Sequence, residues 1–141
     1  MSMFLISTLV VVSVVLIHYE FLHRTSALLP IMKIKHQFRI VVGVFVALIA
    51  HGVEIGIFSL VYYFLPNIEI WGELRGNFDS SLHDCMYFSY TSYTTLGIGD
   101  IEPHGAIRHL VGLESLTGLL LITWTASFLF FEMQRYWNEG D

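Results

Sequence analysis

The sequence predicts an all-α membrane protein with three transmembrane helices and, between the last two, a short re-entrant helix and a glycine-rich loop. Three observations favour this fold class. Hydrophobic residues make up 55% of the 141-residue chain and charged residues only 13%. Three apolar segments reach about the 20 residues that a helix needs to cross a bilayer. The stretch 94–100 carries two glycines at alternate positions between the second and third of these segments.

Composition also excludes several kinds of function. The net charge is −5 and the chain has no long basic run, so we expect no nucleic-acid partner. Cys85 is the single cysteine, which rules out an intrachain disulfide. The sequence shows no zinc-spaced Cys/His set and no nucleotide-binding glycine loop. We therefore expect no catalytic residue and no cofactor, and we expect the lipid bilayer as the main partner.

Residues 1–22 are predicted to form the first transmembrane helix. A cleaved signal peptide is the competing interpretation. No Lys or Arg precedes the apolar run, and Thr25-Ser26-Ala27 is a poor cleavage site, so we expect this helix to be retained. Residues 23–37 are predicted to be a cytoplasmic basic linker, because four of the seven Lys and Arg fall at or next to it, at 24, 33, 35 and 39. The N-terminus then lies outside and the C-terminus in the cytoplasm.

Residues 38–135 form the second predicted unit. Its elements are an outer helix at 38–65, an acidic turret loop at 66–79, a short helix at 80–93, a loop at 94–100 and an inner helix at 104–135. The short helix cannot cross a bilayer, so it is predicted to be re-entrant. Irregular backbone at membrane depth is tolerated only when it is buried in protein or lines a water-filled path.

The loop has the chemistry of an ion-conducting pore. Gly97 and Gly99 allow backbone conformations that turn successive carbonyl oxygens toward one axis. Carbonyls from several chains can then replace the water shell of a cation, with the Thr95 hydroxyl as a further oxygen.

Here the chain resembles the potassium-channel pore-loop family, whose filter reads T-V-G-Y-G-D. Thr95, Gly97, Gly99 and Asp100 match this motif, and Leu96 and Ile98 replace the valine and the tyrosine. Pro103 stands where the family has a proline that opens the inner helix. The resemblance implies a homotetramer in the plasma membrane that passively conducts K⁺ through the carbonyls of Thr95–Gly99. A separate regulatory subunit is not indicated. A weakly selective sodium and potassium channel remains an alternative.

The residues around the filter depart from the family pattern. Family filters brace the tyrosine by hydrogen bonds to aromatic residues of the pore helix, and Ile98 and Phe88 have no group for such a bond. An apolar contact between them would leave no unpaired polar group. The other predicted supporting residues are Tyr87, whose hydroxyl is expected to reach Asp100, and Thr91 and Thr94.

Three ionisable residues fall inside the predicted spans: His51, Glu54 and Glu114. Such residues usually face the protein interior and find partners. They form one predicted cluster, read either as a hydrogen-bonded group behind the pore or as a proton- or metal-responsive site. A ring of Glu114 side chains facing the pore is a third reading. The alternative function is an integral-membrane metal-binding protein or enzyme that uses these three residues.

The inner helix also carries candidate pore residues. Thr123 and Ser127 either line a cavity below the filter or bond back to helix carbonyls. Gly118 is either a hinge or a point of tight helix packing.

Overall fold

The structure is a computed structural model that describes residues 2–65 and 71–138. In chain order its elements are α1 (Ser2–Leu28), the 3₁₀ turn η1 (Leu29–Ile31), α2 (His36–Phe64), β1 (Glu73–Gly76), α3 (Leu82–Tyr93), β2 (Ile101–His104) and α4 (Ile107–Asn138). Three segments are long and apolar enough to cross a membrane: Met3–Ile31, Gln37–Phe64 and Ile107–Arg135. The predicted fold class, an all-α membrane protein, is confirmed.

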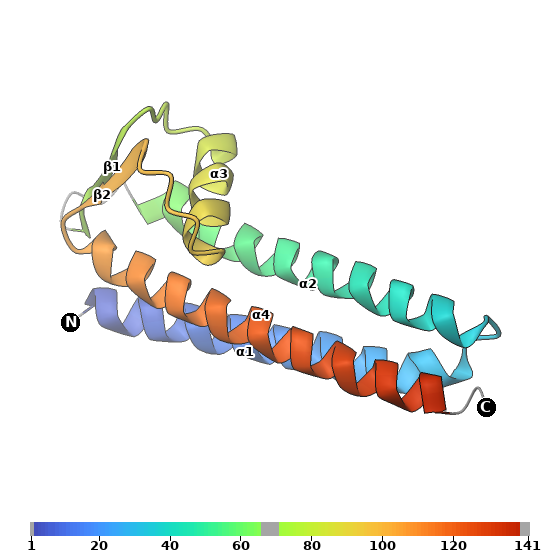
Figure 1. The fold of residues 1–141 in the computed structure, drawn as a ribbon. Coiled ribbons are helices and arrows are strands. Elements are labelled where there is room, and N and C mark those ends of the chain that lie inside the picture. Colours follow the sequence, from blue (N-terminus) through green and yellow to red (C-terminus); the bar gives the residue numbers. More distant parts are fainter. Residues whose placement is uncertain (1, 66–70, 139–141) are drawn as a thin grey trace.

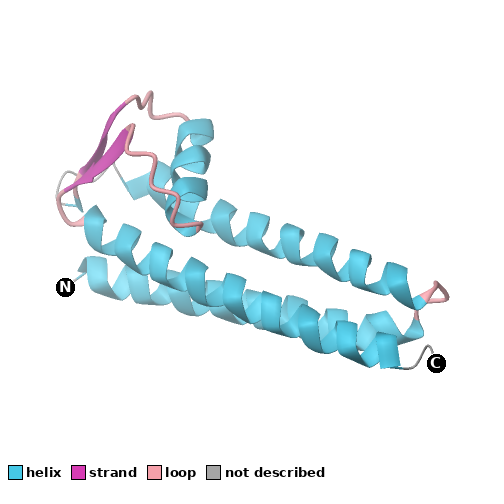
Figure 2. Cartoon of the chain, viewed as in Figure 1, coloured by secondary structure: helices cyan, strands magenta, loops and turns pink. Residues whose placement is uncertain are grey.

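The three long helices lie side by side, and the short elements gather at one end of them (Figure 1). Helix α1 packs against both α2 and α4, and α3 packs against α2 and α4. The N-terminus lies at the end that carries α3 and the two strands, and the α1–α2 connection and the C-terminus lie at the opposite end (Figure 1). Figure 2 shows the segment between α3 and β2 as a loop that runs along the side of α3.

Helix α1 is longer than predicted. It continues beyond residue 22 to Leu28, so most of the predicted 23–37 linker is helical and only a short turn precedes α2. Polar residues sustain this extension: Arg24 donates to Glu20 at 2.5 Å, and Thr25 bonds back to the Phe21 carbonyl at 2.6 Å. Pro30 then lies in η1, where a missing N–H costs little.

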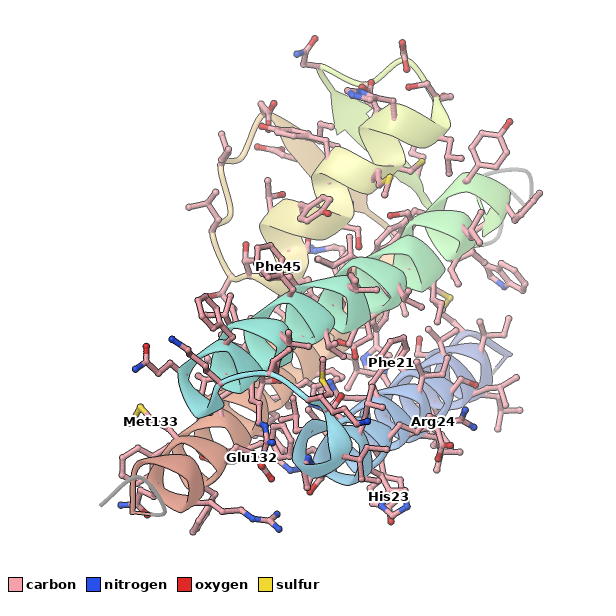
Figure 3. All side chains as sticks on the ribbon, turned by 90° about the vertical axis from the view of Figure 1, so that its right-hand side faces the viewer. Phe21, His23, Arg24, Phe45, Glu132 and Met133 are labelled. Atoms are coloured by element: carbon pink, nitrogen blue, oxygen red, sulfur yellow. The ribbon has the colours of Figure 1, made fainter. Side chains whose placement is uncertain are left out.

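One side of α1 is buried against the other helices. Its buried residues recur every three or four positions, at Met3, Ser7, Val10, Val14, His18, Leu22 and Thr25. This spacing places them on one helix face. At the end that faces the viewer in Figure 3, Ser26 donates to Glu132 of α4 at 3.2 Å. Helix α1 is therefore an integral part of the bundle.

A two-stranded ribbon replaces part of the predicted turret. Strands β1 and β2 pair antiparallel, with Glu73 opposite His104 and Leu74 opposite Pro103. Pro103 therefore does not open the inner helix, which begins at Ile107 rather than 104. Proline is tolerated at an edge strand because its missing N–H can face away from the partner strand. The first part of the predicted turret, 66–70, lies outside the described residues.

Candidate functional site: the pore loop and its buried supports

The short helix α3 begins with a well-formed cap. The Ser81 hydroxyl accepts the backbone N–H of Asp84 at 3.1 Å. The backbone N–H of Ser81 in turn donates to Asp79 at 2.8 Å. Hydrogen bonds from Ser81 lower the pKa of Asp79 below its usual value, because they stabilise the charged form. The cap sets where the helix starts and therefore where the loop after it begins.

The loop after α3 has an alternating backbone. Thr95, Gly97 and Gly99 all have positive φ, at 58°, 57° and 85°. Two hydrogen bonds fold the loop back on the helix end, from the Thr95 N–H to the Ser92 carbonyl and from the Gly97 N–H to the Thr91 carbonyl, each at 3.0 Å. Backbone of alternating handedness turns successive carbonyls toward the same side. Thr95 is the unusual member, since side chains other than glycine rarely adopt positive φ.

The side chains of the loop are exposed in the single chain. Leu96 is 66% exposed and Ile98 56% exposed. Thr94 bonds back to the Tyr90 carbonyl at 2.6 Å. An unpaired loop with apolar side chains is expected to be covered by other subunits or by protein packed against it.

The residues predicted to support the filter differ in the contacts that they make. Asp100 is held from two sides, by its side-chain bond with the Tyr87 hydroxyl and by a bond from the Asn77 N–H to its carbonyl at 2.9 Å. Thr91 instead bonds back to the Phe88 carbonyl at 2.9 Å. The Phe88 ring is buried and packs edge-on against the Tyr62 ring, with 5.1 Å between the ring centroids. A contact of Phe88 with Ile98 stays a prediction for the assembled pore.

Glu54 is the centre of one buried network. Its carboxyl group bonds the Nδ1 atom of His18 at 2.8 Å, the Nδ1 atom of His51 at 3.0 Å and the hydroxyl of Tyr93. The Thr125 hydroxyl lies on the other side of both rings, 3.3 Å from His18 Nε2 and 3.1 Å from His51 Nε2. Helices α1, α2, α3 and α4 all contribute side chains to this network. The residue from α3 is Tyr93, which directly precedes Thr94.

Glu114 belongs to a different network, which corrects the predicted three-residue cluster. The Tyr62 hydroxyl and the Ser89 hydroxyl donate to its two oxygens. Ser89 also contacts the Ile55 carbonyl at 3.1 Å. Similar depth in the bilayer does not bring the two carboxyl groups together, because α3 packs against both α2 and α4 and supplies a separate hydroxyl partner to each.

Sequence reasoning missed His18. It falls inside the first predicted transmembrane helix, 1–22, and is not among the three ionisable residues singled out from the sequence. A histidine in the middle of such a run was itself the available signal, since ionisable residues inside spans usually face the interior. His18 is fully buried, and its ring packs on Trp124 of α4 with 5.3 Å between ring centroids.

The candidate pore residues of α4 divide into two groups. Thr123 and Ser127 are exposed in the single chain and bond back to the carbonyls of Leu119 and Thr123, at 2.7 Å and 3.0 Å. Gly118 instead lies against the end of α3. A Cβ atom added there would stand 2.1 Å from the Tyr93 carbonyl oxygen. Close packing of α3 on α4 therefore accounts for this glycine.

Comparisons with known proteins agree with the geometry of the loop. A family model described as "Ion channel" matches residues 50–135, which include α3, the loop and most of α4. The chain is 38% identical over 77 residues to the potassium channel subfamily K member 7 of Mus musculus. That match covers 50% of this chain and 24% of the mouse protein, so the chain spans about a quarter of the length of this curated relative. No solved structure shows a significant match.

The family match includes residues 95–103, on which the resemblance was stated. An ion channel family is not a family of enzymes, so the expectation that this chain is not an enzyme is confirmed. The chain belongs to the potassium-channel pore-loop family of ion channels.

Proposed function

We propose that four copies of this chain form a passive potassium channel, with K⁺ held by the carbonyl oxygens of Thr95–Gly99. The single observation that carries the proposal is the positive φ at Thr95, Gly97 and Gly99. This alternation aligns carbonyls along one side of the loop. Four such rows around an axis provide the oxygen cage that replaces the hydration shell of a cation.

The tetramer is inferred from the family resemblance, because the family's pore is built from four such loops. One chain contributes one loop, and a closed ring of identical head-to-tail contacts covers the same surface on every copy. The exposed apolar side chains of Leu96 and Ile98 are the surface that such a ring would bury. A cavity of about 360 Å³ lies between α3, the loop and α4, and Phe88 and Val111 contribute to its lining. In the proposed tetramer this cavity receives Ile98 of the partner subunit.

The proposed channel lies in the plasma membrane with its loop at the outer side. Arg24, Lys33, Lys35 and Arg39 lie near the α1–α2 connection, at the end of the bundle opposite to the loop. The positive-inside rule places that end in the cytoplasm. The N-terminus then lies outside and the C-terminus inside.

Purified protein in liposomes tests the proposal. A potassium gradient should drive a flux that a pore-blocking quaternary ammonium ion stops, and chemical cross-linking should give a tetramer. Protein-free liposomes are the control. Flux that the blocker does not change, or a cross-linked species that stops at the dimer, would contradict the proposed pore.

A weakly selective cation channel is the second candidate. The observation that favours it is the lack of a hydrogen-bonded brace, because Ile98 has no hydroxyl and the Phe88 ring packs on Tyr62. Dispersion contacts are less directional than hydrogen bonds, so the filter is easier to deform. The reversal potential with potassium on one side and sodium on the other separates the two candidates: a value near zero favours the weakly selective channel.

A further inference from the structure

The network around Glu54 contains the ligand set of a transition-metal site. Its ring nitrogens and carboxylate oxygens come from His18, His51 and Glu54, and these donor atoms lie within 4.8 Å of one another. Glu54 and His18 are fully buried, and the side chain of His51 is 16% exposed, which leaves one side of the cluster accessible. Two imidazoles and a carboxylate are a common protein ligand set for Zn²⁺.

The hydrogen-bond pattern of the two rings is compatible with a bound cation. When both neutral rings donate from Nδ1 to Glu54, both Nε2 atoms are acceptors. Thr125 faces both Nε2 atoms, at 3.3 Å and 3.1 Å, and its single hydroxyl hydrogen can satisfy only one of them. A mixed pair of ring tautomers removes this conflict, because the Tyr93 hydroxyl can donate to His51 Nδ1 and His51 Nε2–H to Thr125, and a cation bound in place of the two Nδ1 hydrogens removes it as well.

A metal ion at the Nδ1 side leaves a hydrogen-bond acceptor for the second nitrogen of each ring. Each ring then carries its hydrogen on Nε2, and the Thr125 oxygen accepts from both. Ligating histidines usually donate their second ring N–H to such an acceptor, which orients the ring. Two ligands of a tetrahedral Zn²⁺ lie about 3.3 Å apart, and the observed Nδ1-to-oxygen distances are 2.8 Å and 3.0 Å. The donor atoms, which lie within 4.8 Å of one another, would move to this common spacing around the ion.

We propose that His18, His51 and Glu54 bind one Zn²⁺-like transition-metal ion per chain, with the Tyr93 oxygen as the fourth ligand. The Tyr93 hydroxyl lies 3.0 Å from His51 Nδ1 and also bonds Glu54. A divalent ion with one carboxylate and one phenolate has no net charge, which suits a buried site where an unbalanced charge is costly. The phenolic proton is released, whereas each ring keeps one hydrogen, which lies on Nε2 when Nδ1 binds the ion. The nitrogen donors favour Zn²⁺ or Co²⁺ over Ca²⁺, Mg²⁺ or K⁺.

The site links α1 to the pore loop. His18 lies on α1, and Tyr93 is the last residue of α3 before the loop. An ion bound to both ties the first helix to the start of the filter. The proposal does not require the channel to conduct, and its test measures binding to the purified protein.

The test is a titration of the full chain in detergent, stripped of metal with EDTA and carrying no affinity tag. With Zn²⁺ alone, equilibrium dialysis should give one tightly bound ion per chain. With Co²⁺ alone, the visible spectrum should show the strong bands of a tetrahedral ion. His18→Gln and His51→Gln should lose both signals. The control is His23→Gln, which changes an exposed histidine on the same helix as His18 and should keep both signals.

Two milder variants keep the test decisive if the buried histidine variants do not fold. Thr125→Val removes the acceptor behind both rings and should weaken Zn²⁺ binding by about 10- to 100-fold. Tyr93→Phe should weaken it as well and change the Co²⁺ spectrum. No saturable Zn²⁺ binding by wild type would show that the hydrogens of the side chains alone complete the network and would overturn the proposal. Unchanged affinity in both Thr125→Val and Tyr93→Phe would overturn it too.

Discussion

Gly118→Ala should separate α4 from the end of the pore helix. The new Cβ atom would stand 2.1 Å from the Tyr93 carbonyl oxygen and 2.9 Å from its carbonyl carbon. Distances below 3.0 Å essentially never occur for real Cβ atoms. Both carbonyl atoms are backbone, so rotation of the Tyr93 side chain, whose Cγ atom also lies 2.9 Å away, does not relieve the contact.

The expected change in the free energy of unfolding is a balance of two opposing effects. Alanine in place of glycine inside a helix gains about 1 kcal/mol of helix propensity. Overpacking costs about 1–3 kcal/mol and more where rigid backbone must move. We expect a net loss of roughly 1–2 kcal/mol in the free energy of unfolding at this position, because the contact is with backbone.

Gly112→Ala is the matched control on the same helix. No atom lies within 4 Å of a Cβ atom added there, outside its own helix backbone and chain neighbours. This variant should be unchanged or up to about 1 kcal/mol more stable. The apparent melting temperatures of the two variants should differ by roughly 5–10 °C.

The assay is thermal unfolding of the purified protein in detergent, followed by potassium flux in liposomes. Flux should fall in Gly118→Ala, because Tyr93 directly precedes Thr94 and Thr95 and its displacement shifts the filter. Equal stability and equal flux in the two variants would refute the close contact between α3 and α4.

Three further predictions concern the pore loop and the N-terminal cap of α3. Gly99→Ala should abolish conduction, because its φ of 85° is a backbone conformation that costs other residues about 1–2 kcal/mol; wild-type flux and selectivity in this variant would remove the filter assignment. Ile98→Tyr with Phe88→Trp should raise the potassium-to-sodium selectivity measured from reversal potentials more than the two single variants together, and an additive double-mutant cycle would contradict the packing argument. The lowered pKa of Asp79 stabilises the folded state above the unfolded value of 3.8, and this contribution is lost as pH falls through the folded pKa. The melting temperature of wild type should therefore drop more between pH 5 and pH 3 than that of Asp79→Asn, and equal drops would argue against the Ser81 cap.

Much of the fold follows from the sequence because long apolar segments at membrane depth have few alternatives. The ends of the helices were less predictable. Helix α1 continues through Glu20, Arg24 and Thr25, whose local hydrogen bonds sustain a helix after the apolar run has ended. Hydropathy indicates where a segment leaves the hydrocarbon core of the bilayer, and a helix can continue beyond that point.

The β ribbon could not be predicted from local pattern. Its strands read E-L-R-G and I-E-P-H, and each contains a residue that is uncommon in strands. They pair across the whole of α3 and the loop, which no local periodicity encodes. The Asn77–Asp100 bond next to the ribbon ties the end of the filter to the start of α3, so the missed element is one that positions the site.

The buried network shows a different limit of sequence reasoning. The spacing of His51 and Glu54 predicts that they share a helix face, and they do bond each other. The contribution of His18 depends on how α1 packs, which the apolar run does not determine. Glu114 was grouped with them by depth alone, and the polar face of α3 decides otherwise.

The position of the pore helix depends on buried polar contacts more than on its own stability. At 12 residues, α3 is too short to be a stable helix in isolation. Ser89 and Tyr93 lie four residues apart, and each donates to a different buried carboxyl group, Glu114 and Glu54. An acceptor left without its donor at such a site costs about 1–3 kcal/mol, which makes each contact specific for one helix position. The proposed filter begins at the next residue, and Gly97 bonds back to the Thr91 carbonyl, so the two carboxyl groups position the loop without lining the proposed K⁺ path.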